Sequence, residues 1–418
     1  MEVALIREFY CLKTRATELS VTNNIVSAIK KSDITKIGLR LYDGKCIGVA
    51  GAIGAYDENK LEARARQMLD FKIPYECEPA REIKRVEDLS GEFALSDAEF
   101  LEKSETLLGM LSRNYPDFAF NHKIIFTSIE NSLRNDCGAD LEYKDKFVVI
   151  ELYLKHKDST SLMDSFGISL ARSFDLEDAF NVVSETCACY SEKVALPDEK
   201  MPVVFLFDQT AVLLKFFTDL NGRMMWTGAS LFSDKVGQKL FADHFSLCVE
   251  RDPHDSYKCF FDAEGTVLPS DCFELIQNGV LKSAYASKRV ASQFNHAITG
   301  SAEGDYDSVP DTSYGAIKVK SGDKTIKELL GGRKAVYVVM ASGGDFTPQG
   351  EFATPVQAAF LFDGERLTGR LPQLSISSNI FDMYGKDYIG VSSDGKSSHA
   401  PFKYLALDMS VSTIGDRV

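Results

Sequence analysis

The sequence predicts an α+β protein, with an N-terminal half of β-hairpins and helices and a C-terminal half of largely antiparallel strands with few helices. The order strand–strand–helix occurs twice before residue 195. In the second half, Asn278-Gly279 and Asp363-Gly364 each lie between apolar runs, which is the pattern of a two-residue hairpin turn. Helical periodicity is rare after residue 220.

The first half begins its regular pattern with a hairpin over residues 36–56. Ile37, Leu39 and Leu41 alternate along one strand, and Asp43-Gly44 supplies the turn. Further elements are expected as a helix at 58–69, a polar linker at 74–105, a helix at 97–112, strands at 118–129 and 146–154 around a turn at 134–138, and an amphipathic helix at 176–190.

A polar break at 195–201 precedes the buried strand PVVFLF. Asp208 is placed to cap a helix that carries Leu213, Phe217 and Leu220. Later elements are a strand at 334–340 and short helices at 234–240 and 326–330. We therefore expect two domains, 1–195 and 200–418, and the first divides into two subdomains if the segment 74–105 is a linker.

Composition limits the function. The chain has 418 residues, with 61 acidic and 47 basic residues and a net charge of −14, which argues against general nucleic-acid binding. Nine scattered cysteines without a CxxC pair indicate a reducing compartment. The first residues lack the apolar stretch of a signal peptide, and no apolar run is long enough to cross a membrane. A cytoplasmic location is expected.

The sequence contains no local motif that is typical of an active site. The six histidines are never three to five residues apart, and HExxH, GxSxG and Walker A patterns are absent. Among the cysteines, Cys248 is the strongest candidate for a nucleophile, because it lies between His244 and His254. However, FSLCVE has the pattern of a strand, so a packed thiol is favoured.

An acidic cluster follows that strand. Asp252, Asp255, Asp262 and Glu264 supply oxygen ligands for a hard cation, but their spacing does not match a calcium loop. A solvated turn is the favoured interpretation.

Several segments of the C-terminal half occur in a characteristic order. LFSDKVGQKLFADHFSLCVERDPH, FDAEGTVL and ELIQNGVLKS are followed by SGGDFTPQGEF, a strand–DGERL–strand hairpin, SISSNIFDMY and APFKYLALDMSVS. This order resembles the TldD/PmbA family (PmbA is also called TldE), once named modulators of DNA gyrase. The resemblance is good over 200–418 and weaker before it. Its motif positions include Asp252, Pro253, Asp262, Gly265, Gly279 and Asn379.

The resemblance implies a cytoplasmic zinc metallopeptidase that acts on unfolded or leader peptides as a pair of related subunits. One subunit carries HExxxH after the first strand of the C-terminal domain and a cysteine near the chain end. Here Lys215, Phe216 and Leu220 stand near the HExxxH positions, and Ser392 lies in the late loop without a cysteine. An ammonium repels Zn²⁺, and without the glutamate no base activates water. The chain thus resembles the non-catalytic PmbA-type subunit.

Three functions remain open. The chain is a zinc-less subunit that helps an HExxxH-bearing relative bind and process peptides, a homodimeric peptide-binding protein without proteolysis, or a hydrolase with an unrecognised site such as Cys248 or the acidic cluster. A homodimer or heterodimer is expected, without membrane or direct nucleic-acid binding. No cofactor is expected, apart from zinc supplied by a partner subunit.

A peptide cleft is expected at the glycine-rich segment 342–350. Gly343 and Gly344 let another backbone approach closely, and Asp345 is placed to orient a peptide amide. An open strand edge in the C-terminal half would bind the peptide through main-chain hydrogen bonds. The alternative is a plain surface loop.

Overall fold

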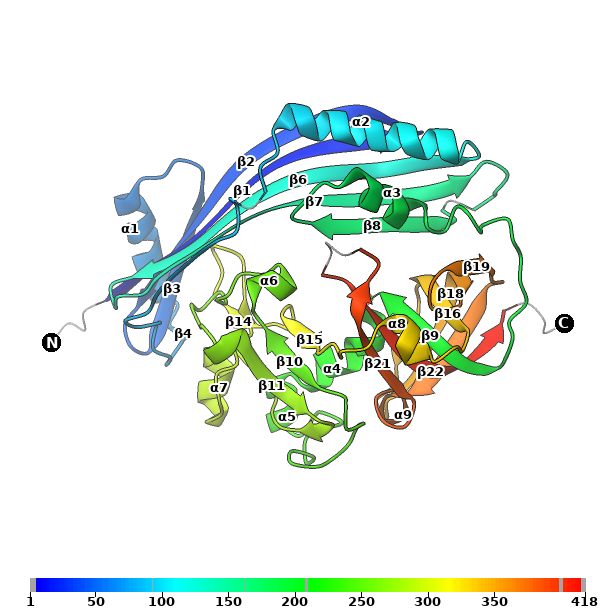
Figure 1. Ribbon diagram of the computed structural model, residues 1–418. Helices are drawn as coiled ribbons and strands as arrows, with labels where there is room; N and C mark the ends of the chain where they lie inside the picture. Colours follow the sequence, from blue (N-terminus) through cyan, green and yellow to red (C-terminus); the bar gives the residue numbers. More distant parts are fainter. Residues whose placement is uncertain (1–4, 92, 162, 207–209, 398–400, 415–418) are drawn as a thin grey trace.

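The computed structural model describes residues 5–91, 93–161, 163–206, 210–397 and 401–414. It confirms the α+β class (Figure 1). The N-terminal half is built on one sheet of long strands, in the order β4-β3-β2-β1-β6-β7-β5, with β8 also paired to β7. The strands are β1 (Ile6–Thr22), β2 (Ile25–Tyr42), β3 (Cys46–Ile53), β4 (Ile73–Pro74), β5 (Lys84–Asp88), β6 (Phe118–Asn135), β7 (Asp140–His156) and β8 (Ser165–Ala171).

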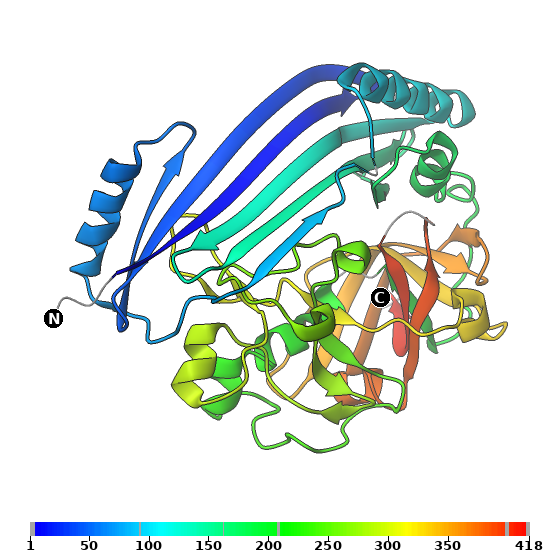
Figure 2. The same ribbon diagram turned by 60° about the vertical axis from the view of Figure 1, so that its left-hand side comes forward.

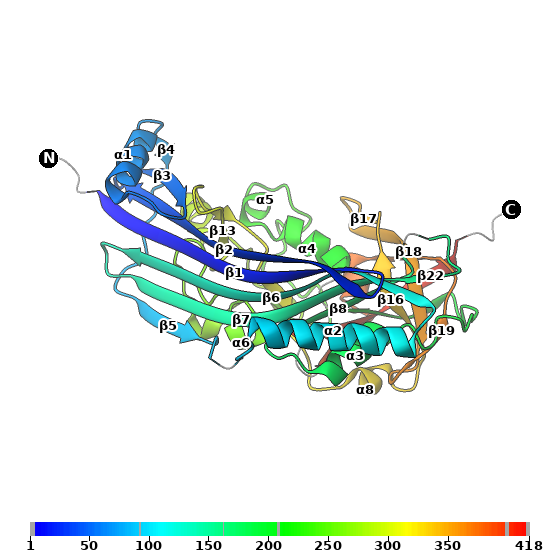
Figure 3. The same cartoon turned by 90° about the horizontal axis from the view of Figure 1, so that it is seen from above.

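Three helices cover parts of this sheet: α1 (Glu58–Leu69), α2 (Asp97–Asn114) and α3 (Leu176–Ser184). α2 begins with a capping box between Ser96 and Glu99, which satisfies backbone donors of its first turn. Apolar residues of α2, including Phe100 and Leu107, are fully buried. α2 and α3 lie side by side in the view from above (Figure 3).

In the C-terminal half, five strands of the larger sheet form a closed ring. β16 pairs with β9, the order continues through β22, β20 and β18, and β18 pairs back to β16. The neighbours are antiparallel except for β9 and β16. The ring strands are β9 (Lys200–Leu206), β16 (Ala335–Ala341), β18 (Glu351–Phe362), β20 (Leu374–Asn379) and β22 (Lys403–Thr413), with β17 (Asp345–Phe346), β19 (Leu367–Arg370) and β21 (Tyr388–Gly395) attached.

A second, smaller sheet of this half has the order β12-β11-β10-β15. Its strands are β10 (Leu247–Glu250), β11 (Cys272–Gln277), β12 (Val280–Leu281) and β15 (Ile317–Val319); β13 (Ala302–Glu303) and β14 (Asp311–Thr312) form a separate ribbon. The short helices are η1 (Thr210–Leu213), α4 (Leu214–Asp219), α5 (Gly222–Trp226), α6 (Pro253–Ser256), η2 (Pro269–Asp271), α7 (Lys288–Phe294), α8 (Ile326–Leu330) and α9 (Ile380–Met383).

The N-terminal sheet arches over the C-terminal half (Figure 2), and specific polar contacts join them. The Arg172 guanidinium donates to both carboxylate oxygens of the buried Asp145 at 2.8 Å and to the Pro253 carbonyl at 2.6 Å. Pro253 opens α6, so this arginine ties the sheet to the smaller C-terminal sheet. One apolar cluster also spans both halves, from Leu152 of β7 to Tyr404 of β22.

Most elements with a strong local signal are confirmed. The helix at 58–69 has the predicted bounds, and the hairpins at Asp43-Gly44, Asn278-Gly279 and Asp363-Gly364 are present. The helix predicted at 176–190 ends at Ser184. Asp208 lies outside the described residues. None of the described helices has the length and apolarity needed to cross a bilayer.

The helix predicted at 234–240 is wrong. This segment is a series of turns. Gly237 has a φ of 85°, which ends a right-handed helix, and its N–H donates to the Leu281 carbonyl on β12 rather than to a carbonyl one helical turn earlier.

Candidate functional site

A cavity of about 320 Å³ lies between the two halves, at the carboxyl ends of the parallel strands β9 and β16. Phe166 and Ile168 of β8 form one wall, and residues 339–341 of β16 form another. Thr354 of β18 adds a hydroxyl, and Lys396 is the charged group among the described residues of the lining. The site is therefore a mainly apolar cleft bounded by strands of both sheets, a type of lining that binds small molecules or side chains.

Lys396 is fixed by partners rather than free in the cleft. Its Nζ lies 2.8 Å from Oε2 of Glu185, and the Tyr337 hydroxyl donates to the same oxygen at 3.3 Å. The described lining contains no histidine, cysteine or carboxylate. It can hold apolar groups beside a fixed cation, but among the described residues its lining offers no histidine or carboxylate that would activate the Thr354 hydroxyl.

The helix after β9 carries the predicted zinc positions, and their side chains are packed into the protein. Lys215 is buried, and its Nζ lies 3.2 Å from Oδ2 of Asp219, one turn along α4. That carboxylate oxygen also accepts the Leu231 N–H at 2.8 Å. The ion pair therefore places a held cation where a zinc ligand would be needed.

Phe216 and Leu220 belong to the apolar core. The Phe216 ring is fully buried, with its centroid 4.8 Å from that of Tyr384 and 5.5 Å from that of Phe245. Leu220 is also fully buried. Ser392 lies on β21, where its hydroxyl donates to the Asp394 carbonyl and accepts the Tyr404 N–H. These side chains do not fit a zinc ion, because only Ser392 offers a donor atom and that atom is already satisfied within the sheet.

The predicted peptide segment lies next to the cavity. Gly344 packs against Thr354, so a Cβ at Gly344 would lie 2.1 Å from the Thr354 Cβ. Gly343 has a φ of 88°, and a Cβ there would make an ordinary contact with the Pro355 ring, 3.9 Å from its Cγ. Asp345 is exposed, and its Oδ1 accepts the N–H of the following Phe346 at 2.7 Å. The glycines thus form a rim behind the cavity wall, while Asp345 folds back on its own backbone.

The six family-motif positions are occupied by residues that hold turns and helix ends. Asp252 caps α6 through the His254 N–H, and Asn379 caps α9 through the Phe381 N–H. Asp262 accepts the backbone N–H groups of Glu264, Thr266 and Ala302. Pro253 binds Arg172, Gly265 packs against Leu133 of the N-terminal sheet, and Gly279 lies against the Phe241 carbonyl.

The interpretation of the acidic cluster as a solvated turn is wrong for two of its members. Asp262 and Glu264 are both about 2% exposed. Glu264 accepts the Tyr75 hydroxyl at 2.5 Å and the Lys288 backbone N–H at 2.6 Å, while burial, together with the charge of Asp262, raises the pKa of Glu264 to about 7. Tyr75 lies 189 residues away in sequence, so only tertiary folding reveals this burial.

Cys248 is a packed thiol, as expected. It is fully buried on β10, and a hydrogen bond with the neighbouring Cys272 thiol, together with burial, raises its pKa. The flanking histidines do not activate it: His244 packs against Tyr388, and His254 lies 3.7 Å from Glu87. The sequence analysis missed Glu250, which lies two residues along the same strand, and Cys272, which only the pairing of β10 with β11 brings close to Cys248.

Comparison with known proteins agrees with the fold. Residues 198–412 match the family model described as the PmbA/TldA metallopeptidase C-terminal domain. A metalloprotease of Methanocaldococcus jannaschii is 24% identical over 160 residues, which span 38% of this chain and 35% of that protein. The chain thus matches about a third of the length of this relative.

Solved structures resemble the whole chain. TldE from Thermococcus kodakarensis has a TM-score of 0.79 and 17% identity, over 97% of this chain and 96% of that one. A protein from Thermotoga maritima named as a modulator of DNA gyrase has a TM-score of 0.75 and 18% identity over the same shares. A similarly named protein from Bacteroides thetaiotaomicron has a TM-score of 0.76 and 15% identity, over 98% of this chain and 95% of that one.

Proposed function

Because this chain belongs to the PmbA/TldD metallopeptidase family, we propose that it is a zinc-less subunit that binds unfolded or leader peptides for a relative carrying the HExxxH motif. The observation that carries the proposal is the packing of α4. Lys215 is held by Asp219, and Phe216 fills an aromatic cluster. Zinc catalysis requires several ligands and an open coordination position, and neither residue supplies a ligand.

The cavity between the halves supports a role in peptide binding. It combines apolar walls from Ile168 and Met340 with the fixed ammonium of Lys396. An apolar peptide side chain would enter between β8 and β16, and Lys396 would favour a carboxylate or carbonyl nearby. Binding that depends on one apolar pocket tolerates many sequences, which suits unfolded substrates.

The first part of β2 supports pairing with a second subunit. Residues 25–34 pair with β1, whereas β3 covers β2 only from Lys36 onward in the described chain. The uncovered stretch exposes Ile25, Ile29 and Ile34 at 65%, 52% and 42%. A long strand edge with exposed apolar side chains is a surface that proteins normally cover.

Reconstitution with the HExxxH-bearing relative from the same organism tests the proposal. The chain alone should not cleave an unfolded peptide, with or without added zinc, and the pair should cleave it. Ile168→Asp places a charge in the cavity and should raise the KM of the pair. Ile298→Asp makes the same change at a site that is 44% exposed outside the cavity, and serves as the control.

Two outcomes contradict the proposal. Cleavage by the chain alone that depends on a histidine would show an unrecognised active site. A stable homodimer that binds peptide but neither binds nor stimulates the HExxxH-bearing relative would favour the peptide-binding protein without proteolysis.

A further inference from the structure

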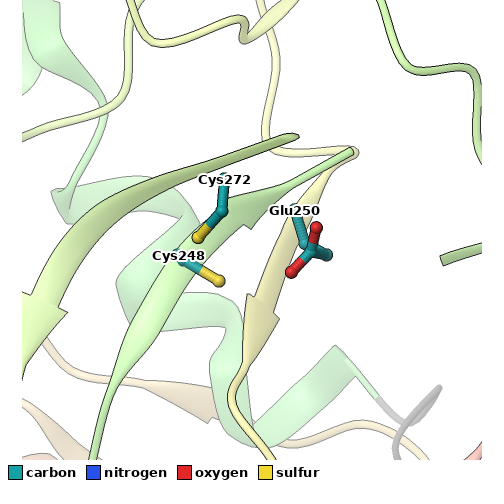
Figure 4. A group of neighbouring side chains, drawn as sticks. All are labelled: Cys248, Glu250 and Cys272. Atoms are coloured by element: carbon teal, nitrogen blue, oxygen red, sulfur yellow. The ribbon is translucent and has the colours of Figure 1, made fainter. Parts of the chain in front are cut away.

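Three potential metal ligands converge on one face of the smaller C-terminal sheet, away from the predicted zinc positions on α4. Cys248 and Glu250 alternate along β10, so their side chains share a face, and Cys272 pairs directly with Glu250 from β11. The two Sγ atoms and a carboxylate oxygen all lie within 4.8 Å of one another. Figure 4 shows the three side chains next to one another on the neighbouring strands.

These separations suit a shared cation. Zinc bonds are about 2.3 Å to sulfur and about 2.0–2.2 Å to a carboxylate oxygen, so ligands on one tetrahedral ion lie roughly 3.5–3.8 Å apart. Side-chain rotations that move the ligand atoms by up to about 1 Å would bring the three atoms into that range. Two thiolates with one carboxylate are donors that a borderline-soft ion such as Zn²⁺ accepts.

The charges around the cluster leave Glu250 without a cation of its own. Glu250 is half-buried and forms no ion pair among the described residues. The nearby Lys318 donates its ammonium to the Asp255 carbonyl, and Lys320 pairs with Glu274. The Asp252 N–H donates to Oε1 of Glu250 at 2.9 Å and orients the carboxylate, as outer partners of metal ligands do.

The strand register favours an ion over a disulfide. Cys248 pairs with Glu274, so Cys272 is its diagonal rather than its direct neighbour. Diagonal neighbours across antiparallel strands are about 7–8 Å apart, with their Cβ atoms somewhat closer, whereas the Cβ atoms of a disulfide lie about 3.5–4.5 Å apart. Glu250 also lines a cavity of about 370 Å³ beside β15, which gives an ion a route from solvent.

We propose that Cys248, Glu250 and Cys272 form a binding site for a thiophilic divalent cation of the Zn²⁺ type. The site uses residues separate from the HExxxH positions, so it binds metal whether or not the chain takes part in proteolysis. Binding releases the thiol protons to solvent and forms two metal–sulfur bonds and one metal–oxygen bond.

Titration of the reduced, metal-free full chain with Co²⁺ tests the site. We expect one equivalent to produce thiolate-to-Co²⁺ charge-transfer absorption and the visible bands of a tetrahedral ion, and one equivalent of Zn²⁺ to abolish both. Cys272→Ser and Glu250→Gln change partly exposed residues, so these variants should fold. Each should weaken Zn²⁺ binding by about 100-fold or more, because even outer-shell changes cost about 10–100-fold.

Cys77→Ser is the matched control, because Cys77 is also partly buried but lies outside the cluster. Its binding should equal that of the unchanged protein. Absence of the charge-transfer band, or its persistence in Cys272→Ser, overturns the proposal. A second result also overturns it: protein isolated without reductant has a Cys248–Cys272 disulfide, seen as a mass lower by two hydrogens, and the same protein binds no Co²⁺ after reduction. Peptidase activity enters none of these readouts, so the result is independent of the proposed function.

Discussion

Replacement of Glu264 by glutamine should remove a specific pH dependence of stability. In the folded protein this carboxyl is buried, and its pKa is about 7 rather than the ordinary value of 4.5. Glutamine keeps the shape of the side chain. Its carbonyl can accept the Lys288 N–H, and its amide can donate to the Tyr75 oxygen, so both hydrogen-bond positions stay filled.

The sign follows from proton binding. Between pH 4.5 and 7 the unfolded chain has lost the Glu264 proton while the folded protein retains it, so stability falls as the pH rises through this window. Each pKa unit corresponds to about 1.4 kcal/mol, so the shift of roughly 2.5 units costs the unchanged protein about 3 kcal/mol above pH 7. Glutamine does not titrate, and its effect on the free energy of unfolding is constant.

Urea unfolding at pH 5, 6, 7 and 8 measures this difference. The stability of Glu264→Gln relative to the unchanged protein should rise by about 2–3 kcal/mol from pH 5 to pH 8, because titrating groups that do not interact with Glu264 cancel in the comparison. Glu365→Gln makes the same substitution at a carboxylate that is 64% exposed and serves as the surface control. Equal pH profiles for Glu264→Gln and the unchanged protein would refute the reasoning.

Three further predictions concern packing, each measured by chemical denaturation. Gly279→Ala should lower the free energy of unfolding by more than about 2 kcal/mol, because a Cβ there would lie 2.2 Å from the Phe241 carbonyl oxygen. Gly228→Ala is the control: it has a similar positive φ but open space around it, and it should lower the free energy of unfolding by only about 1 kcal/mol. Equal losses would contradict the predicted clash. Phe216→Ala should cost about 3–5 kcal/mol from the cavity it leaves, and a cost below 1 would show that α4 is loosely packed. Arg172→Met should cost about 3–5 kcal/mol by leaving the buried Asp145 uncompensated, and Arg172→Lys should recover part of this loss; a neutral Arg172→Met would show that the contact is dispensable.

Elements whose signals are local could be predicted from the sequence. The helix at 58–69 begins after Asp57, whose side chain accepts the Lys60 N–H. The turns of two hairpins use Gly44, Asn278 and Gly279, which adopt positive φ. The strand predicted at 118–129 continues to Asn135. The sequence did not show this continuation because it is polar, and pairing with β1 and β7 on both sides stabilises it in the structure. Pairing partners far away in sequence therefore set the strand lengths.

The same limit applies more strongly to the candidate sites. The cavity joins β8 with β16, and neither segment carries a motif. At 234–240 the residues favour a helix, but the bond from Gly237 to Leu281 overrides that preference. The resemblance to a family located the α4 positions, whereas their packing into an ion pair and an aromatic cluster required the structure.

Glu264 shows why composition alone gave the wrong environment for the acidic cluster. A carboxylate is expected to be exposed unless partners compensate for its burial, and here those partners come from both halves of the chain. Tyr75 belongs to the N-terminal half and Lys288 to the C-terminal half, so the environment of Glu264 exists only once the halves have docked. The buried Arg40, whose guanidinium donates to the Ala263 carbonyl and lies 3.2 Å from Glu8, reinforces the same junction. Glu264 was expected to face solvent and is instead buried, because it lies at the contact between the two halves.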